Sequence, residues 1–354
     1  MSKVRKGALG MAAALAMCGM AAAQDTQVSA RAKGMGGSYT AFGDDPISIW
    51  QNPAGTATQE TKVALAYQSF ITYEFAMGGL GAAPAQDLPG ASQATLNDPQ
   101  IQPSFLGVVT SLKTEEFDHA FSFGFINPIN MALVWSDGAG PLNILLTTQQ
   151  MSRFRVGYAV DLTLVESGEG VLTHIAVGGG IDWGSTNYEA ESQGGGTVKE
   201  SESRFGFGLG ILTTIYSDGK EFSVDLGASY NSKLDFDYNV PVQGATSVPI
   251  VDWPAEWSVG IAVYIGRLKV AASIGGVFWE DAAASSTVAG RSGFEDTTNA
   301  SAGAEYALHL PGDVTAFLRA GIRRFDAPWD SETLADALMA ASKMASACIS
   351  VTSG

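Results

Sequence analysis

The feature that most constrains the fold of this chain is a strict alternation of apolar residues with small, polar or charged residues over long segments. Between Phe154 and Leu164 every second residue is apolar. The same period recurs over 205–211, 222–230 and 257–265. Successive side chains of a β-strand point to opposite faces, so this period predicts strands with one apolar and one polar face.

The length of these segments favours a barrel in a membrane over a soluble sandwich. Several run for about ten residues or more, whereas strands of globular proteins average about five to six. Some connections are very short, as at 217–220 and 266–267, while others are long. Short turns on one rim and long loops on the other are typical of outer-membrane barrels. A soluble secreted β-sandwich that binds sugars is the alternative that alternation alone leaves open.

The predicted fold is therefore all-β, a transmembrane antiparallel β-barrel built as a meander of hairpins. Aromatic residues near the segment ends, such as Trp183, Tyr216 and Trp253, suit membrane interfaces, although any one of them could equally be packed in a core. The predicted strands lie near 62–73, 102–112, 117–127, 152–166, 171–190, 198–217, 221–240, 255–266, 268–281, 299–310 and 313–325.

The first 23 residues read as a secretory signal peptide. A basic start containing Lys3 and Arg5 precedes an uncharged, Ala-rich segment that ends in Ala21-Ala22-Ala23. We therefore expect residues 1–23 to be removed and the mature chain to reside in the bacterial outer membrane. The formal charge of −16 disfavours nucleic acid as a partner, because phosphates would be repelled.

Residues 24–61 differ from the rest because they do not alternate and instead contain glycines, prolines and short polar motifs. They read as a compact segment of turns and short helices. The motifs are Gly34, Gly36 and Gly37 within Ala30–Phe42, then Asp44-Asp45-Pro46, then Asn52-Pro53-Ala54-Gly55.

These motifs resemble the hatch of the FadL/TodX family of outer-membrane transporters for long-chain fatty acids and other hydrophobic compounds. Weaker similarity continues through Phe123–Pro128, 253–257 and 319–329. The resemblance implies a barrel of 62–354 around a plug of 24–61. A PorV-like barrel that serves a protein secretion system has a similar Gly-rich start and Asn-Pro-Ala, and is the alternative.

The resemblance also implies roles for particular residues. The hatch motif comprises Gly34, Gly36, Gly37, Asn52, Pro53 and Ala54. A kink that opens the wall sideways would involve Asn127, Pro128 and Asn130, since Pro128 cannot donate a ladder hydrogen bond. Residues lining the substrate route would be Phe42, Trp50 and Phe125.

The family barrel has fourteen strands, an even number as in other single-chain bacterial barrels. With eleven predicted strands, we expect the last strands to be absent from 62–354. The final residues Ser350–Gly354 look like the start of a further strand, and 331–345 suits a short helix with Ser331 as N-cap.

A transporter needs no catalytic residue, and we expect no enzyme activity, no cofactor and no metal. His174 is interpreted as a polar residue of the barrel interior, and Asp44-Asp45 as solvated loop charge, because no calcium-loop pattern is present. The expected partners are a hydrophobic small-molecule substrate, outer-membrane lipid and lipopolysaccharide, and the barrel assembly machinery. We expect a monomer.

Overall fold

The computed structural model describes residues 29–70, 100–114, 117–134, 144–165, 169–192, 197–236, 252–281, 295–311, 314–325 and 346–353. Within these, strands account for most residues, as alternation predicts. The first six strands are β1 (Lys62–Phe70), β2 (Gln100–Lys113), β3 (Asp118–Val134), β4 (Ile144–Thr163), β5 (Glu169–Ser192) and β6 (Thr197–Asp218). The others are β7 (Phe222–Asn231), β8 (Ala255–Ile265), β9 (Leu268–Phe278), β10 (Thr297–Leu310), β11 (Val314–Phe325) and β12 (Ser346–Ser353).

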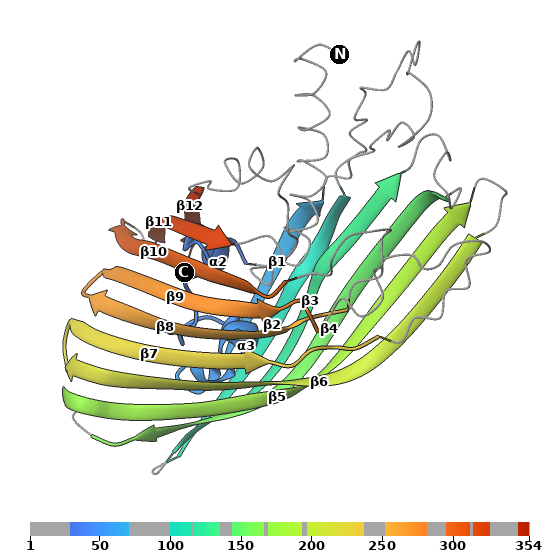
Figure 1. Cartoon of the computed structure of the whole chain (residues 1–354). Helices are drawn as coiled ribbons and strands as arrows, with labels where there is room; N and C mark the ends of the chain where they lie inside the picture. Colours follow the sequence, from blue (N-terminus) through green and yellow to red (C-terminus); the bar gives the residue numbers. More distant parts are fainter. Residues whose placement is uncertain are drawn as a thin grey trace.

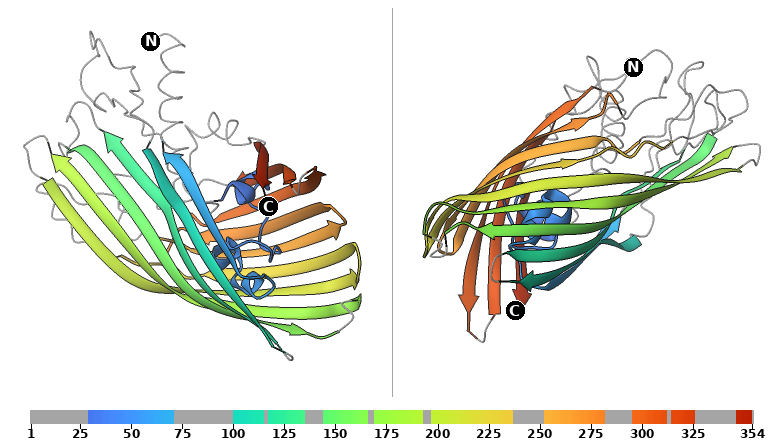
Figure 2. Two further views of the ribbon diagram at one scale, coloured as in Figure 1. Left: turned by 180° about the vertical axis from the view of Figure 1, so that it is seen from behind. Right: turned by 90° about the horizontal axis from the view of Figure 1, so that it is seen from below.

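All these strands form a single antiparallel sheet in which each is paired with its neighbours in the sequence. The sheet curls strongly, so that it has a convex outer face and a concave inner face (Figures 1 and 2). Within the described register, β1 and β12 are its two edges, and the barrel is not closed between them. The two-residue turn between β8 and β9 has Gly266 at φ +56°, a conformation that glycine adopts without steric cost.

The convex face is apolar. On β6 the exposed side chains include Phe205, Leu209 and Ile211, whereas Leu212 and Thr214 on the other face are buried. Burial thus follows the sequence alternation, with the apolar members pointing away from the interior. The described residues contain no helix with the length and hydropathy needed to cross a membrane.

The concave face holds the N-terminal segment, which we call the plug and define as residues 29–59. Its helices are α2 (Ala30–Gly34), α3 (Ser48–Gln51) and the 3-10 helix η1 (Pro53–Thr56) (Figure 1). Ser29 caps α2, because its Oγ accepts a hydrogen bond from the backbone N–H of Ala32. The hydrophobic core therefore lies inside the curled sheet, between plug and wall.

The eleven predicted strands are all present, and β12 adds a twelfth where Ser350–Gly354 was expected to begin one. Strand β3 runs beyond its predicted end at 127, because the chain resumes pairing after Pro128. Strand β7 ends earlier than predicted, at Asn231, and is followed by a single bridge between Leu234 and Trp253. The predicted signal peptide and the predicted helix at 331–345 lie outside the described residues.

Candidate functional site

The plug is fastened to the wall by Asn52, the first residue of the Asn-Pro-Ala motif. Its side chain is fully buried, and its Nδ2 donates to the carbonyl of Thr40 at 2.7 Å and to that of Ile211 on β6 at 2.9 Å. Its Oδ1 accepts from the backbone N–H of Ala54 at 3.2 Å, which caps η1. Pro53 opens η1, where its fixed φ suits the first turn. Both N–H groups and the carbonyl oxygen of the Asn52 side chain are therefore used to shape and anchor the plug.

Glycines in both the plug and the wall allow the two backbones to come into contact. A Cβ added to Gly210 on β6 would collide with Asn52 Oδ1 and Pro53, and one on Gly178 of β5 would lie 2.6 Å from the Pro53 backbone. In the plug, Gly36 has φ +63°, and a Cβ there would lie 2.7 Å from the backbone of Ile322 on β11. The glycines on the inner face thus make room for the plug.

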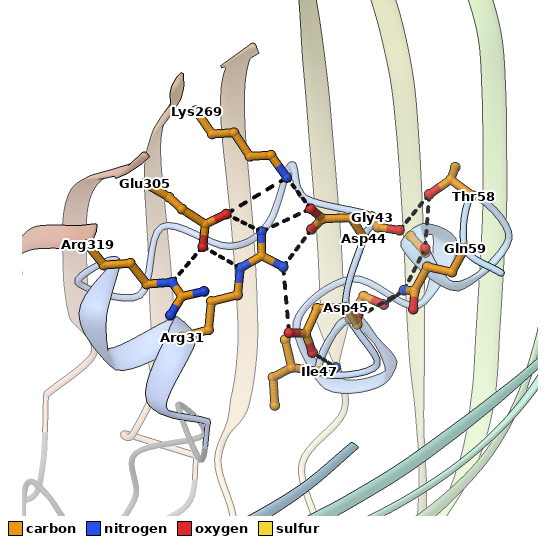
Figure 3. Close-up of polar contacts among 12 residues, drawn as sticks. Arg31, Gly43, Asp44, Asp45, Ile47, Thr58, Gln59, Lys269, Glu305 and Arg319 are labelled. Atoms are coloured by element: carbon orange, nitrogen blue, oxygen red, sulfur yellow. Dashed lines mark hydrogen bonds and ion pairs between the residues drawn. The ribbon is translucent and has the colours of Figure 1, made fainter. Parts of the chain in front are cut away.

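A cluster of ion pairs joins the plug to the wall, centred on Arg31 of α2 (Figure 3). Its guanidinium donates to both oxygens of Asp44, at 3.0 and 2.9 Å, and to both oxygens of Glu305 on β10, at 2.8 Å each. Asp45 lies 3.6 Å from Arg31. Arg31 therefore bridges two carboxylates in the bidentate geometry that makes guanidinium pairs specific.

Two wall cations complete the cluster, so that three positive charges face three negative ones. Arg319 of β11 donates to Glu305 at 2.5 Å, and Lys269 of β9 pairs with Asp44 and lies 3.8 Å from Glu305. Burial by itself would raise the pKa of Asp44, but the charges of Arg31 and Lys269 outweigh burial and hold that pKa well below its ordinary value. The interpretation of Asp44-Asp45 as solvated loop charge was therefore wrong.

A second charged cluster lies buried between the plug and strands β4 and β5. Arg155 donates to Asp182 at 2.5 and 2.7 Å and to the carbonyl of Ile49 in the plug at 2.8 Å. Arg153 donates to the same carboxylate at 3.0 and 2.5 Å. The Trp50 ring lies 4.6 Å from the guanidinium carbon of Arg155, so it packs on the cations of the wall.

Of the three residues predicted for the substrate route, Phe42 and Trp50 belong to the buried core, whereas Phe125 does not. Phe42 is buried in the core, where its ring centroid lies 5.1 Å from that of Tyr39 and 5.9 Å from that of Tyr264 of β8. Trp50 is buried on the inner side of the wall. Phe125 is on the outer face, because its neighbours Gly124 and Ile126 point inward. Alternation along β3 could have assigned Phe125 to the outer face from the sequence.

Phe125 belongs to a row of aromatic side chains across four neighbouring strands of the outer face. The strand register places Phe125 opposite Phe154, Phe154 opposite Trp183, and Trp183 opposite Phe205. The ring centroids of Phe125 and Phe154 lie 4.8 Å apart, and those of Phe154 and Trp183 lie 5.4 Å apart. Trp183 is therefore on the outside, whereas Trp253, also considered for an interface, is buried inside.

The wall is irregular at the predicted kink. The register between β3 and β4 shifts between Ile126 and Ile129, which makes a bulge at Asn127-Pro128, and β3 continues through Asn130. The pairing of β2 with β3 ends at the same point, at Phe105 and Ile126, although β2 extends back to Gln100 and β3 on to Val134. The two strands thus cease to be paired with each other there.

A polar pocket of about 70 Å³ lies between the plug and strands β7 to β11. It occupies the half of these strands nearer the long connections, because it includes the start of β8 and the end of β9. Its lining includes Trp50 but neither Phe42 nor Phe125. The lining residues are Gly37, Thr40, Trp50, Gln51, Ser229, Asn231, Glu256, Trp257, Ser258, Ser273, Ile274, Gly275, Gly276, Val277, Asn299, Ser301 and Arg323.

His174 contacts polar side chains of the inner face, as alternation suggested. Its Nε2 lies 2.5 Å from Thr214 Oγ1, which donates to Asp225 at 2.6 Å, and its Nδ1 lies 3.3 Å from Asp161. His174 and Thr214 thus lie between the carboxylates of Asp161 and Asp225. These four side chains fill part of the barrel interior near the rim that carries the short turns.

Comparison with known proteins identifies the fold. No family model matches the sequence, and neither does any curated protein. Several solved structures match instead. A FadL homologue from Pseudomonas aeruginosa has a TM-score of 0.54 at 15% identity over 86% of this chain and 81% of that one. The toluene transporter TodX of P. putida has a TM-score of 0.54 at 17% identity over 85% and 84%. The monoaromatic hydrocarbon channel CymD has a TM-score of 0.51 at 16% identity over 85% of both chains.

At these identities the likeness shows a shared fold, a curled antiparallel sheet of the FadL/TodX type. Arg31 lies within the predicted motif Ala30–Phe42, and Asp44-Asp45 follow it, but their wall partners Lys269 and Glu305 were not predicted.

Proposed function

We propose that this chain is a transporter of hydrophobic small molecules in the bacterial outer membrane. The observation that carries the proposal is the division of one sheet into an apolar outer face and an inner face that binds a charged, hydrogen-bonded plug. An apolar outer face belongs in lipid, and a filled interior is not an open pore for water-soluble solutes.

Two properties of the outer face, its apolar composition and its height, support the proposal that this face contacts lipid. The exposed fractions of Phe205, Ile181 and Val156 are 76%, 67% and 66%. Shielding such a side chain from water is worth about 1.5–3 kcal/mol. On β6, Phe205 and Tyr216 would lie about 28 Å apart along the barrel axis, given a rise of about 3.3 Å per residue and a tilt of about 40°. An apolar band in outer-membrane barrels is about 25 Å tall.

The route is proposed to leave sideways through the wall. With the plug fastened by Asn52 and Arg31, a substrate moving straight along the axis meets the packed interior. The end of β2–β3 pairing at Ile126 supports a lateral exit there, since the two strands share no ladder beyond that point. A hydrophobic substrate released through the wall passes directly into lipid, which avoids a second transfer through water.

The test is uptake by cells. The exported chain is expressed in a Gram-negative host that lacks its own uptake protein for hydrophobic compounds. Carbonate-resistant membrane association and uptake of labelled toluene and oleate are measured. We expect uptake of at least one of the compounds above the empty-vector level. Recovery in the soluble fraction, or no gain for either compound, would overturn the proposal, and copurification with secreted proteins would point to the secretion-system alternative.

The lateral exit has its own variant. Pro128→Val restores a backbone donor at the bulge, and we expect it to lower uptake severalfold at an unchanged membrane level. Pro311→Val, in the turn after β10, is the matched control and should leave uptake unchanged. Equal uptake by the two variants would place the exit elsewhere.

A further inference from the structure

The polar pocket between the plug and β7–β11 has an unusual lining for a protein that carries hydrophobic compounds. Hydroxyl groups from the plug and two strands meet there in a short chain. Thr40 Oγ1 lies 2.9 Å from Ser258 Oγ, which lies 2.8 Å from Ser229 Oγ. On the inner face of β9, Gly275 lies opposite Ser258, and Ser273 lies two residues further along, opposite Gly260.

Two polar atoms of the pocket have no hydrogen-bond partner among the described residues. They are Ser273 Oγ, which can donate and accept, and Asn299 Oδ1, which accepts. Both atoms are buried, and both residues line the pocket. Leaving buried polar atoms unpaired is unfavourable, so these two atoms need a small hydrogen-bonding group that the described residues do not supply.

The charges of the lining favour a neutral group. Glu256 and Arg323 are the charged residues among those that line the pocket, and they have opposite signs. Glu256 already accepts from Trp253 Nε1 at 3.3 Å, and Arg323 also has an interaction of its own. The lining therefore has no excess cation that could neutralise the carboxylate of a ligand. The hydroxyl group of a ligand needs only a donor and an acceptor, which Ser273 and Asn299 supply.

We propose that this pocket binds the hydroxyl group of a neutral hydrophobic compound, so that the preferred substrates are phenols or alcohols and not plain hydrocarbons. The hydroxyl would donate to Asn299 Oδ1 and share a hydrogen bond with Ser273 Oγ. This inference rests on the proposed function and narrows its substrate class. A site with buried hydrogen-bonding groups disfavours an analogue that lacks the hydroxyl, because those groups would remain unpaired.

The experiment is equilibrium binding to the purified, detergent-solubilised full chain. Radiolabelled p-cresol is compared with toluene, and 1-octanol with octane, so that phenols and aliphatic alcohols are tested separately against hydrocarbons of similar size. We expect at least one hydroxyl compound to bind about tenfold more tightly than its hydrocarbon counterpart, the effect of about one hydrogen bond.

The variants assign that preference to the pocket. Ser273→Ala and Asn299→Leu should each reduce the preference severalfold while leaving hydrocarbon binding unchanged. Ser223→Ala, on the inner face of β7 but not in the pocket lining, is the matched control and should keep the full preference. Heat-modifiable migration on gels confirms that each variant is folded.

The outcomes separate this inference from the function on which it rests. Equal binding of hydroxyl compounds and hydrocarbons, or a preference that survives both pocket variants, would overturn the inference and leave hydrophobic transport standing. Failure of all four compounds to bind, together with no uptake in cells, would overturn both.

Discussion

The side-chain amide of Asn52 in the plug donates a hydrogen bond to the backbone carbonyl of Ile211 in β6, at 2.9 Å. The same amide group also donates to Thr40, so Asn52→Ala would leave two buried carbonyls without that donor. We expect this variant to destabilise the docked plug by about 2–4 kcal/mol, since each unsatisfied buried group costs about 1–3 kcal/mol. Limited proteolysis should then cleave the plug at least tenfold faster than in the parent protein.

Asn187 provides the control for that experiment. It lies on the exposed face of β5, and Asn187→Ala should leave plug cleavage unchanged. Equal protection of the Asn52→Ala plug would show that the plug is held by other contacts.

A single methyl group at Gly210 should also displace the plug. Its Cβ would occupy the space of Asn52 Oδ1 and crowd Pro53, and overpacking of this kind costs about 1–3 kcal/mol. We expect Gly210→Ala to increase hydrogen exchange in the plug. Leu209→Ala changes the next residue but faces outward, so its plug should exchange like that of the parent.

Removing the charge of Glu305 should be strongly destabilising. Its carboxylate accepts from both Arg31 and Arg319 and is almost fully buried. Breaking a buried pair leaves uncompensated charge and costs about 3–5 kcal/mol. We therefore expect Glu305→Gln to lower the unfolding free energy by about that amount in denaturant titrations of the detergent-solubilised protein.

An exposed ion pair gives the matched comparison. Lys199 lies 2.7 Å from Glu189, with much of the lysine side chain in solvent. Surface pairs contribute about 0–1 kcal/mol, so Glu189→Gln should change the same titration little. Similar losses for the two variants would contradict the structural role assigned to Glu305.

The local stability of the segment before β8 should depend on pH because of Asp252. Burial, together with the nearby charge of Asp235, raises the pKa of Asp252 to about 7. Because an unfolded aspartate titrates near 3.9, the folded segment binds more protons between about pH 4 and pH 7. The stabilising contribution of protonated Asp252 is therefore complete below about pH 4 and is lost as the pH rises through about pH 7.

The Leu234–Trp253 bridge should therefore be more stable at pH 5 than at pH 8. The measurement is the opening free energy of the Leu234 amide, from hydrogen exchange corrected for intrinsic rates. Asp252→Asn should abolish the difference between the two pH values. A difference that persists in this variant would assign the pH dependence to another group.

Much of the fold could be predicted from the sequence because alternation is a local property. Each residue of β4 or β6 carries its own indication of which face it occupies, and this pattern gave the strands and the outward direction of their apolar side chains. The bulge at Pro128 was also visible locally, as a missing backbone donor. The end of β7 was not, because the bridge of Leu234 to Trp253 depends on a partner nineteen positions away.

The plug contacts needed information that no local pattern contains. Arg31 and Glu305 are 274 positions apart, and they meet only because the sheet curls around the plug. The small and charged residues of the inner face could be assigned to that face, but their individual partners could not. The burial of Phe42 and Trp50 could not be predicted, because aromatic residues in an irregular segment have no periodicity to show which face is buried.

The pairing of Arg31 with Glu305 also constrains the order of assembly. Sequence-distant contacts form late, after the intervening chain has been arranged. The plug's main guanidinium therefore has no wall carboxylate to bind until β10 is in place. During biogenesis the contacts of Asn52 and Ile49 need only the earlier strands β6 and β4, whereas α2 gains the wall partner of Arg31 only after β10 has been added.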